Sequence, residues 1–366
     1  MDNSITLKFK STGLQRIISI NFVNKPNKVF INDNETSFYS EELNDTNYII
    51  YSNYTIQINS INDIVKLVWD YSLTNCSYMF KGLTNLKNID FSDFDFSFVN
   101  NMEQMFYNCS NLESINFNNG PNKIKVRSMS YMFYNCIKIT SLNLTNFDTS
   151  LVTSMSYMLF NCTGLNNLIL GEFKNTKTTN MKSLFQSCVS LKSLDLKHFY
   201  TPKAEIMWDL FNNAKSLTSL DLSSFDTSMV TDMESMFDGC SKLKALNLSH
   251  FKTSNCSWMN KMFRNCQNLK YLDFRQINTN SLSSMTQMFY GCKSLIYINI
   301  SSINNEIWTN EMFYYTSGNF SYCINNFNNI PTIKSLLNGL IAHILNLFLT
   351  KKILKKKMKT KKKTMK

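Results

Sequence analysis

The chain has 366 residues, 43% of them hydrophobic, which is enough for a continuous core. Its formal net charge is +12, but ten of its lysines lie within residues 351–366, where no acidic residue occurs. The other 350 residues carry 28 basic and 26 acidic side chains and are close to neutral. Because the excess charge is confined to a tail, the composition argues against nucleic-acid binding by the body of the chain.

The amino-terminal residues predict a small β-rich module. Strand-like runs such as SITLKF, KVFIN and IVKLVW are separated by Asn, Asp and Pro-Asn turns, which predicts a module or cap over residues 1–70 with a boundary near 71–75. The first residues, MDNSITLKFKSTGL, lack the apolar run and small-residue cleavage site of a secretory signal. From them we expect no export signal, and a cytoplasmic location is one alternative.

A repeat of about 26 residues fills residues 71–330. The second methionine of the motif MxxMF, or a leucine in its place, recurs at intervals of 26 or 27 residues, with a final interval of 24. The ten anchor residues are Met79, Met105, Met132, Met158, Leu184, Leu210, Met236, Met262, Met288 and Met312. A repeat of this length predicts stacked units, since one unit alone cannot bury its apolar face.

The most regular unit, SLTSLDLSSFDTSMVTDMESMFDGCSKL at residues 216–243, has two halves. Its LxxLxL pattern predicts a short half-buried strand, and DTS then predicts a turn. The following apolar spacing is that of a short helical turn. The core of the unit comprises Leu217, Leu220, Leu222, Phe225, Val230, Met233, Met236, Phe237 and Cys240. The predicted fold class is therefore α/β, a leucine-rich-repeat-like solenoid of about ten units, each a short strand plus a short helical turn.

Stacking predicts ladders of equivalent side chains about 4.8 Å apart. Nine of the ten cysteines occupy apolar positions of the unit, and Cys323 alone lies outside them. We expect reduced core thiols; disulfides or a metal site are the alternatives, although no CxxC pair occurs. The phenylalanine ladder comprises Phe94, Phe147, Phe173, Phe199, Phe225 and Phe251, continued by Ile277 and Ile303.

The unit LxxLDLSSFDTSxVTxMxxMFxxC resembles the repeat of the BspA-like leucine-rich repeat surface proteins, in the subgroup also found as a domain of unknown function in mycoplasma membrane proteins. The resemblance covers about residues 76–316. It implies a cell-surface or adhesion role in a microbe, and a phenylalanine spine where ordinary leucine-rich repeats carry asparagine. The units at 167–188 and 194–214 depart from the motif, so we expect different turns there. An insertion at 118–123 replaces the phenylalanine of its unit.

The carboxyl end contains an apolar segment followed by a basic one. Residues 331–350 follow the spacing of an amphipathic helix, and residues 351–366 form a polylysine tail. The helix can cap the last repeat or, together with the tail, attach to an anionic membrane surface. The segment is short for a transmembrane span, and the tail can also be low-complexity sequence without a partner.

Motifs for catalysis or cofactor binding are absent from the sequence. There is no GxSxG, HExxH, phosphate loop or dinucleotide fingerprint. His198 and His250 are two units apart, too far to share a metal ion. One strand position accepts Asp and Asn equally, from Asp90 to Asn299, which favours hydrogen bonding along the sheet over acid-base chemistry. We therefore expect no catalytic residue, cofactor or metal, and no enzyme.

The candidate partner-binding residues are those that break the repeat on the outer strand face: Tyr271, Arg275 and Tyr297. Tyr and Arg are enriched at binding hot spots, although aromatic rings can also shield the end of a sheet. The leading hypothesis is a non-enzymatic surface or adhesion-type module that binds a protein or glycan on its sheet face. An intracellular scaffold and a membrane-peripheral protein held by the basic tail are the alternatives.

Overall fold

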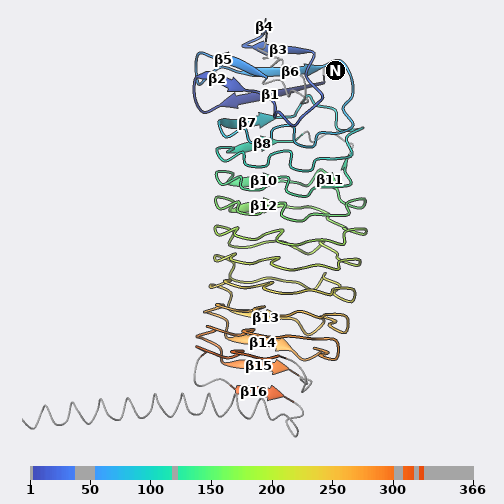
Figure 1. Ribbon diagram of the computed structural model, residues 1–366, viewed down its shortest axis with the longest axis vertical. Helices are drawn as coiled ribbons and strands as arrows, with labels where there is room; N and C mark the ends of the chain where they lie inside the picture. Colours follow the sequence, from blue (N-terminus) through green and yellow to red (C-terminus); the bar gives the residue numbers. More distant parts are fainter. Residues whose placement is uncertain (1–2, 38–53, 118–122, 301–307, 317–320, 325–366) are drawn as a thin grey trace, which may run out of the picture.

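The computed structural model describes residues 3–37, 54–117, 123–300, 308–316 and 321–324. These residues form an elongated β-solenoid in which the turns of the chain stack along the long axis (Figure 1). An antiparallel group of strands lies at the amino-terminal end, and parallel strands follow it along one side. Apolar side chains of both parts join in one core cluster.

The amino-terminal strands are continuous with the first repeats. A six-stranded sheet has the order β4-β3-β6-β1-β7-β8, and β2 pairs with β5 separately. Strand β1 pairs antiparallel with β7, the first strand of the array, through Leu7 opposite Ile89. The first turn of the solenoid is thereby covered. The bounds are β1 (Asn3–Phe9), β2 (Gly13–Arg16), β3 (Lys28–Ile31), β4 (Asn34–Thr36), β5 (Thr55–Ile58), β6 (Val65–Trp69), β7 (Leu86–Asp90) and β8 (Ser114–Asn116).

The strands of the array pair in parallel with the equivalent residues of the next unit. Leu246 faces Leu272, which in turn faces Ile298, so the register advances by one repeat at each step. The four-stranded sheet β13-β14-β15-β16 ends the described part of the array. The bounds are β9 (Ile124–Lys125), β10 (Ser141–Asn143), β11 (Phe147–Asp148), β12 (Asn167–Ile169), β13 (Ala245–Asn247), β14 (Tyr271–Phe274), β15 (Tyr297–Ile300) and β16 (Ser321–Ile324).

The predicted helical turn is wrong, and the described residues contain strands, bridges and turns but no helix. The second half of each unit instead joins the next unit through an isolated parallel bridge. These bridges form one continuous row through Asn75, Asn101, Ser128, Ser154, Asn180, Ile206, Asp232, Trp258, Ser284 and Trp308. In the described ranges the fold is therefore all-β rather than α/β.

Backbone hydrogen bonds show why the helical spacing does not make a helix. In the regular unit the amides of Ser235, Phe237 and Gly239 donate to carbonyls of the next unit at 2.8, 2.9 and 2.7 Å. The amides between them close tight turns within the unit, as from Met236 to the carbonyl of Met233. Ser235 and Gly239 adopt left-handed φ values of 54° and 72°. A left-handed residue every fourth position interrupts the i to i−4 pattern of an α-helix.

The predicted core is confirmed except at Leu220, which packs against the core but is only partly buried. Phenylalanines of the predicted ladder from Phe94 to Phe251 are buried, and the phenylalanines after the second methionine form another stack, as in Phe237 and Phe263 at 5.4 Å. Nine cysteines are buried and free, and the Cys240 thiol donates to the carbonyl of Phe211 at 3.1 Å. Burial raises the pKa of Cys240 to about 12, so this thiol stays protonated. The side chains of Cys323 and Ile303 lie outside the described residues.

The DTS segment forms the predicted turn and also bridges two units. Asp226 accepts from the amide of Ser228 at 3.0 Å, as an Asx turn requires. Thr227 is buried, and its hydroxyl donates to the carbonyl of Lys252 and accepts from the amide of the same residue. In the irregular unit at 167–188 the equivalent buried residue is Asn175, whose side-chain amide has no partner in the described part of the chain.

Three predicted segments fall wholly or mainly outside the described residues: the insertion at 118–123, the amphipathic helix at 331–350 and the polylysine tail at 351–366. Within the described ranges there is no helix with the length and hydrophobicity that a membrane crossing requires.

Candidate binding surface

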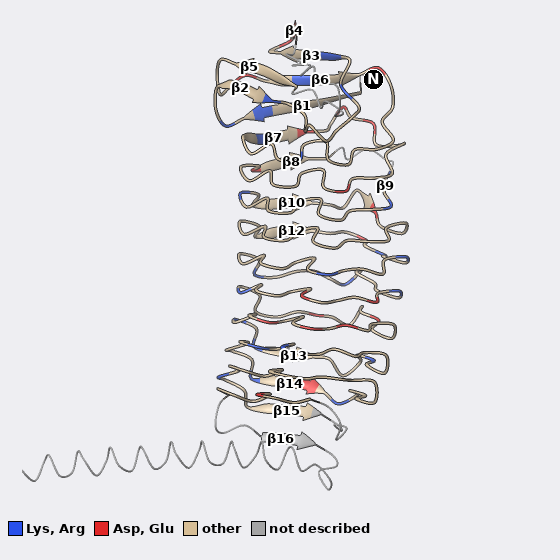
Figure 2. Ribbon diagram, viewed as in Figure 1, with Lys and Arg blue, Asp and Glu red and all other residues tan. Residues whose placement is uncertain are grey.

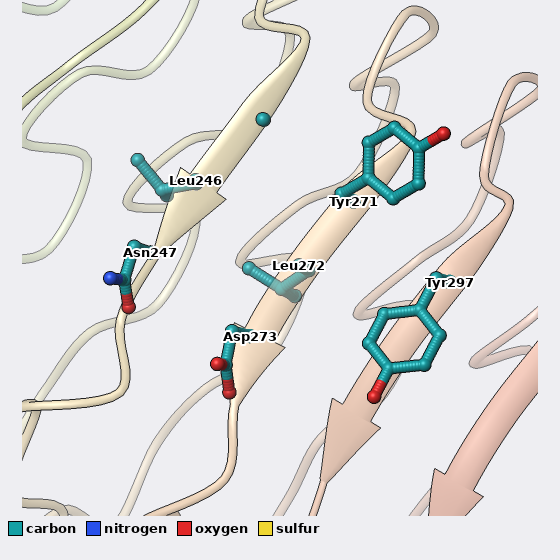
Figure 3. Close-up of a pocket in the computed structure, with 7 residues that line it drawn as sticks. Leu246, Asn247, Tyr271, Leu272, Asp273 and Tyr297 are labelled. Carbon is teal, nitrogen blue, oxygen red and sulfur yellow. The ribbon is translucent and has the colours of Figure 1, made fainter.

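The outer face of β13, β14 and β15 carries the aromatic residues singled out in the sequence. Alternation along each strand turns Leu246 and Leu272 into the core and leaves Tyr271 and Tyr297 on the outer face (Figure 3). The two tyrosines are direct register partners, and Ala245 is the partner of Tyr271 on its other side. Tyr271 keeps 52% of its surface exposed.

A shallow depression of about 280 Å³ lies on this face. The depression forms because Ala245 is small, whereas the next two strands carry tyrosine at the same position. The surface therefore drops beside the Tyr271 ring, and we call this drop the step at Ala245. Its lining is mostly apolar, with carboxylate and amide groups at the end where the strands terminate (Figure 3). The lining residues are Ala245, Leu246, Asn247, Tyr271, Leu272, Asp273 and Tyr297.

Arg275 lies at the end of the same strand and is bound to Asp273. Its Nε donates to both carboxylate oxygens of Asp273 at 3.0 Å, and its Nη2 forms an ion pair with the same group. The hydrogen bonds from Arg275 lower the pKa of Asp273 below its ordinary value. The three predicted residues therefore share one face, but the charge of Arg275 is offset by Asp273.

The strand position that carries Asp or Asn in successive units forms a column of carboxylate and amide groups. These groups mainly make local hydrogen bonds. Asp221 accepts from the amide of Ser223 at 3.0 Å, and Asn247 accepts from Ser249 at the same distance, which fixes the turn after each strand. The predicted bonding along the sheet occurs at Asn116, whose amide donates to Asp90 at 2.9 Å. The column therefore shapes the strand ends.

The two repeat histidines have different surroundings. His198 is exposed, whereas a ring nitrogen of His250 bonds with the carbonyl of Leu222 at 2.8 Å. His250 also contacts Phe251 edge-on. In the part of the chain that the structure describes, no group of three or more His, Cys, Asp or Glu side chains could hold a metal ion.

A second aromatic cluster, not singled out in the sequence, lies in the turn-rich half of the amino-terminal repeats. Tyr134 stacks on Tyr107 at 4.5 Å and on Phe160 at 4.7 Å, with the ring planes nearly parallel. Lys81 lies over Tyr107, and Lys182 lies over Tyr157 and over Trp208. The recurrence of aromatic residues two positions after the anchor methionine was the signal for this stack.

An acidic cluster follows this stack in the next turns. Burial, together with the nearby Asp238 and Glu234 charges, raises the pKa of Asp209 to about 6, against a hydrogen bond from Asn212. Burial also raises the pKa of Asp238, although Arg264 donates to its carboxylate. Burial of these carboxylates destabilises the fold once they are ionised, and the nearby lysine and arginine charges partly offset this effect.

Comparison with known proteins identifies the repeat. The family model described as "Mycoplasma protein of unknown function, DUF285" matches residues 44–141, 127–245 and 207–327, which together span more than half of the chain. A solved structure of a leucine-rich repeat protein from Bacteroides ovatus is similar at 18% identity over 77% of this chain and 84% of that chain, with a TM-score of 0.29. No curated protein matches the chain. With three matches over most of its length, the chain belongs to the family of mycoplasma proteins of unknown function, DUF285.

Proposed function

We propose that the chain is a non-enzymatic interaction module that binds a protein or glycan through the outer face of β13 to β15. The observation that carries this proposal is the adjacent pair Tyr271 and Tyr297 beside the step at Ala245. Large aromatic rings with a polar end supply contact area at low entropic cost, which is why they are enriched at binding hot spots.

Comparison with the other repeat units indicates that Tyr271 and Tyr297 have a role beyond stabilising the solenoid. At the strand position of these tyrosines the earlier units carry small residues: Asn88, Ser114, Ser141, Asn167, Ser193, Ser219 and Ala245. The solenoid therefore stacks without aromatic rings at this position. If the tyrosines merely shielded the end of the sheet, Tyr271 would be covered by the next strand, yet it remains half exposed. The exposed ring favours a partner.

We further propose a surface or adhesion role, which rests on the family resemblance alone. An intracellular scaffold and a membrane-peripheral protein attached through residues 351–366 are the competing locations. Fractionation of cells that produce the chain, with and without the ten tail lysines replaced by glutamine, separates the three. Surface exposure that is independent of the tail supports the first proposal, and recovery in the soluble fraction contradicts it.

The binding proposal is tested by replacing Tyr271 and Tyr297 with serine, the residue of other units. The full-length variant is expected to lose at least about tenfold in affinity for a partner captured by the parent chain, because hot-spot tyrosines contribute about 2 kcal/mol or more. Its melting temperature should stay unchanged. Tyr200→Ser, at another exposed tyrosine, is the matched control. Undiminished capture by the double variant would remove this face from consideration.

A further inference from the structure

A row of lysines borders the tyrosine depression. In consecutive units, the loop that leads into each strand carries exposed lysines, and no acidic residue lies between that loop and the middle of the strand. Figure 2 shows the basic segments along the strand-entry side of these turns. None of these lysines forms an ion pair with another described residue. This lysine edge comprises Lys192, Lys215, Lys242, Lys244, Lys270 and Lys293.

Backbone hydrogen bonds align three members of the lysine edge in one column along the solenoid. The amide of Lys270 donates to the carbonyl of Lys244 at 2.8 Å, and the amide of Lys244 donates to Thr218 at 3.3 Å. The amide of Thr218 donates in turn to the carbonyl of Lys192 at 3.4 Å. Lys244 and Lys270 are therefore one strand spacing of about 4.8 Å apart, and Lys192 lies two turns before Lys244, with Thr218 between them. Lys244 and Lys270 immediately precede Ala245 and Tyr271, so the charges flank the depression.

We infer that the lysine edge and the tyrosine depression together bind a linear anionic glycan, a chain of sugar rings that carry carboxylate or sulfate groups. This inference rests on the proposed function and names the ligand class of the same face. The ammonium groups attract the anionic groups of the glycan. The exposed ring of Tyr271 offers an apolar surface with a polar tip, suited to the C–H face and hydroxyl groups of a sugar.

The spacing of the edge favours a glycan over the other common polyanions. An extended glycan advances by about 5 Å per sugar ring, close to the rise of about 4.8 Å per solenoid turn. An extended acidic peptide presents side chains of one face about 6.8 Å apart. Phosphates of a B-form DNA strand follow one another every 3.4 Å or so along the axis. Anionic groups on successive sugars can therefore reach Lys244 and Lys270 on successive turns, and a group two sugars further along can reach Lys192.

The edge is also distinct from the remainder of the body. Outside the tail the chain carries nearly equal numbers of basic and acidic side chains, so the lysine edge is a local excess rather than part of a general positive field. Some lysines elsewhere in the array form ion pairs, as Lys87 with Glu113 and Lys261 with Glu234, whereas no member of the lysine edge does so within the described residues.

The test measures binding of the full chain to a sulfated glycan and to a polyuronate, with a neutral glycan of similar length as the reference. The polylysine tail is itself a polyanion binder, so the ten lysines of residues 351–366 are replaced by glutamine in every sample. The variant Lys192→Gln, Lys244→Gln, Lys270→Gln removes three charges from the edge. Lys177→Gln, Lys203→Gln, Lys252→Gln removes three exposed lysines from the loops after the strands and is the matched control.

We expect the sulfated glycan, the polyuronate or both to bind, and the neutral glycan not to bind. The relative affinities of the first two show whether sulfate or carboxylate groups are preferred. The edge variant should lose at least about tenfold in affinity and show a weaker salt dependence, while the control variant changes by less than about twofold. Equal binding to poly-glutamate or to single-stranded DNA, absence of glycan binding, or an unchanged edge variant would each overturn the inference.

The same samples separate this inference from the proposed function. Loss of partner capture in Tyr271→Ser, Tyr297→Ser without any glycan binding by the parent refutes the anionic glycan and keeps the tyrosine face. Glycan binding that depends on the lysines but not on the tyrosines refutes the shared site. Glycan binding that both variants weaken, with unchanged melting temperatures, supports the two together.

Discussion

Two aromatic regions of the same solenoid differ in how their rings are used. In the amino-terminal turns Tyr107, Tyr134 and Phe160 stack at 4.5 and 4.7 Å, and Lys81 lies over the outer ring. On the sheet face near the other end, Tyr271 stands half exposed beside a step in the surface. Stacked rings satisfy each other's faces and have little left to offer a ligand. The comparison separates aromatic residues that stabilise the solenoid from those that face a partner.

The largest expected effect is on the stack of Tyr107, Tyr134 and Phe160. Replacing Tyr134 with alanine removes its two stacked ring contacts and should lower the free energy of unfolding by about 2 kcal/mol, since each aromatic pair contributes about 0.5–1.5 kcal/mol beyond its buried area. Tyr271→Ala should change it by less than about 0.5 kcal/mol, because the side chain lies on the outer face. Urea unfolding followed by circular dichroism measures both. If both variants lose the same free energy of unfolding, the stacked rings contribute no more to stability than the exposed Tyr271.

An intermediate effect is expected at Asp209, in the turn after the stack. Its folded-state pKa of about 6 lies above the unfolded value near 3.8, because burial disfavours the carboxylate. A raised carboxyl pKa means that stability is gained as the pH falls through about 6 and that the full penalty is present above it. Asp209→Asn should therefore stabilise the chain at pH 8 by about 1 kcal/mol, a value reduced for the screening of this half-exposed group.

At pH 4 this advantage should disappear, because the carboxyl of the parent is then protonated as well. Unfolding at the two pH values measures the difference. Asp221→Asn is the control: the Ser223 amide lowers the pKa of this exposed carboxylate, so its replacement should bring no gain at pH 8. A pH-independent gain at Asp209 would contradict the titration and point to the left-handed backbone at this residue, which asparagine tolerates better.

The smallest expected effect is at Lys182, which lies 3.7 Å from the centre of the Trp208 ring and 5.4 Å from that of Tyr157. Lys182→Gln should cost about 0.5–1 kcal/mol through the lost cation–π contacts. Lys177→Gln, at a neighbouring exposed lysine, should cost nothing measurable. Thermal unfolding with tryptophan fluorescence follows both variants. If Lys182→Gln is as stable as the parent at both low and high salt, the cation–π contacts of Lys182 do not stabilise the stack.

Much of the core could be predicted from sequence. The repeat gave the register directly, so Phe225, Met236 and Cys240 were assigned to the interior and are buried there. Tyr271 and Tyr297 could be placed as neighbours because equivalent residues of adjacent units must pair. The DTS turn also followed from its residue types. These predictions depend only on which side chains recur in phase.

The helical turn was wrong because a helix and a stack of turns bury the same positions. A signal against the helix was present: the residue just before the cysteine position is asparagine or glycine in most units, as in Asn135, Asn161 and Gly239, and these residues have positive φ. The residue before the anchor methionine gave no such warning, since Tyr131 and Lys261 are left-handed there as well. That conformation costs about 1–2 kcal/mol per non-glycine residue, so the surrounding turns must impose it.

The sequence by itself determined the period, the register and the identity of the core, because equal spacing forces equivalent residues into the same layer. The tertiary structure decided where the backbone amides bond, because a neighbouring turn at about 4.8 Å offers carbonyl acceptors that an isolated segment lacks. It also decided which rings are stacked against one another and which lysines remain unpaired beside Tyr271, because both depend on the contacts between turns.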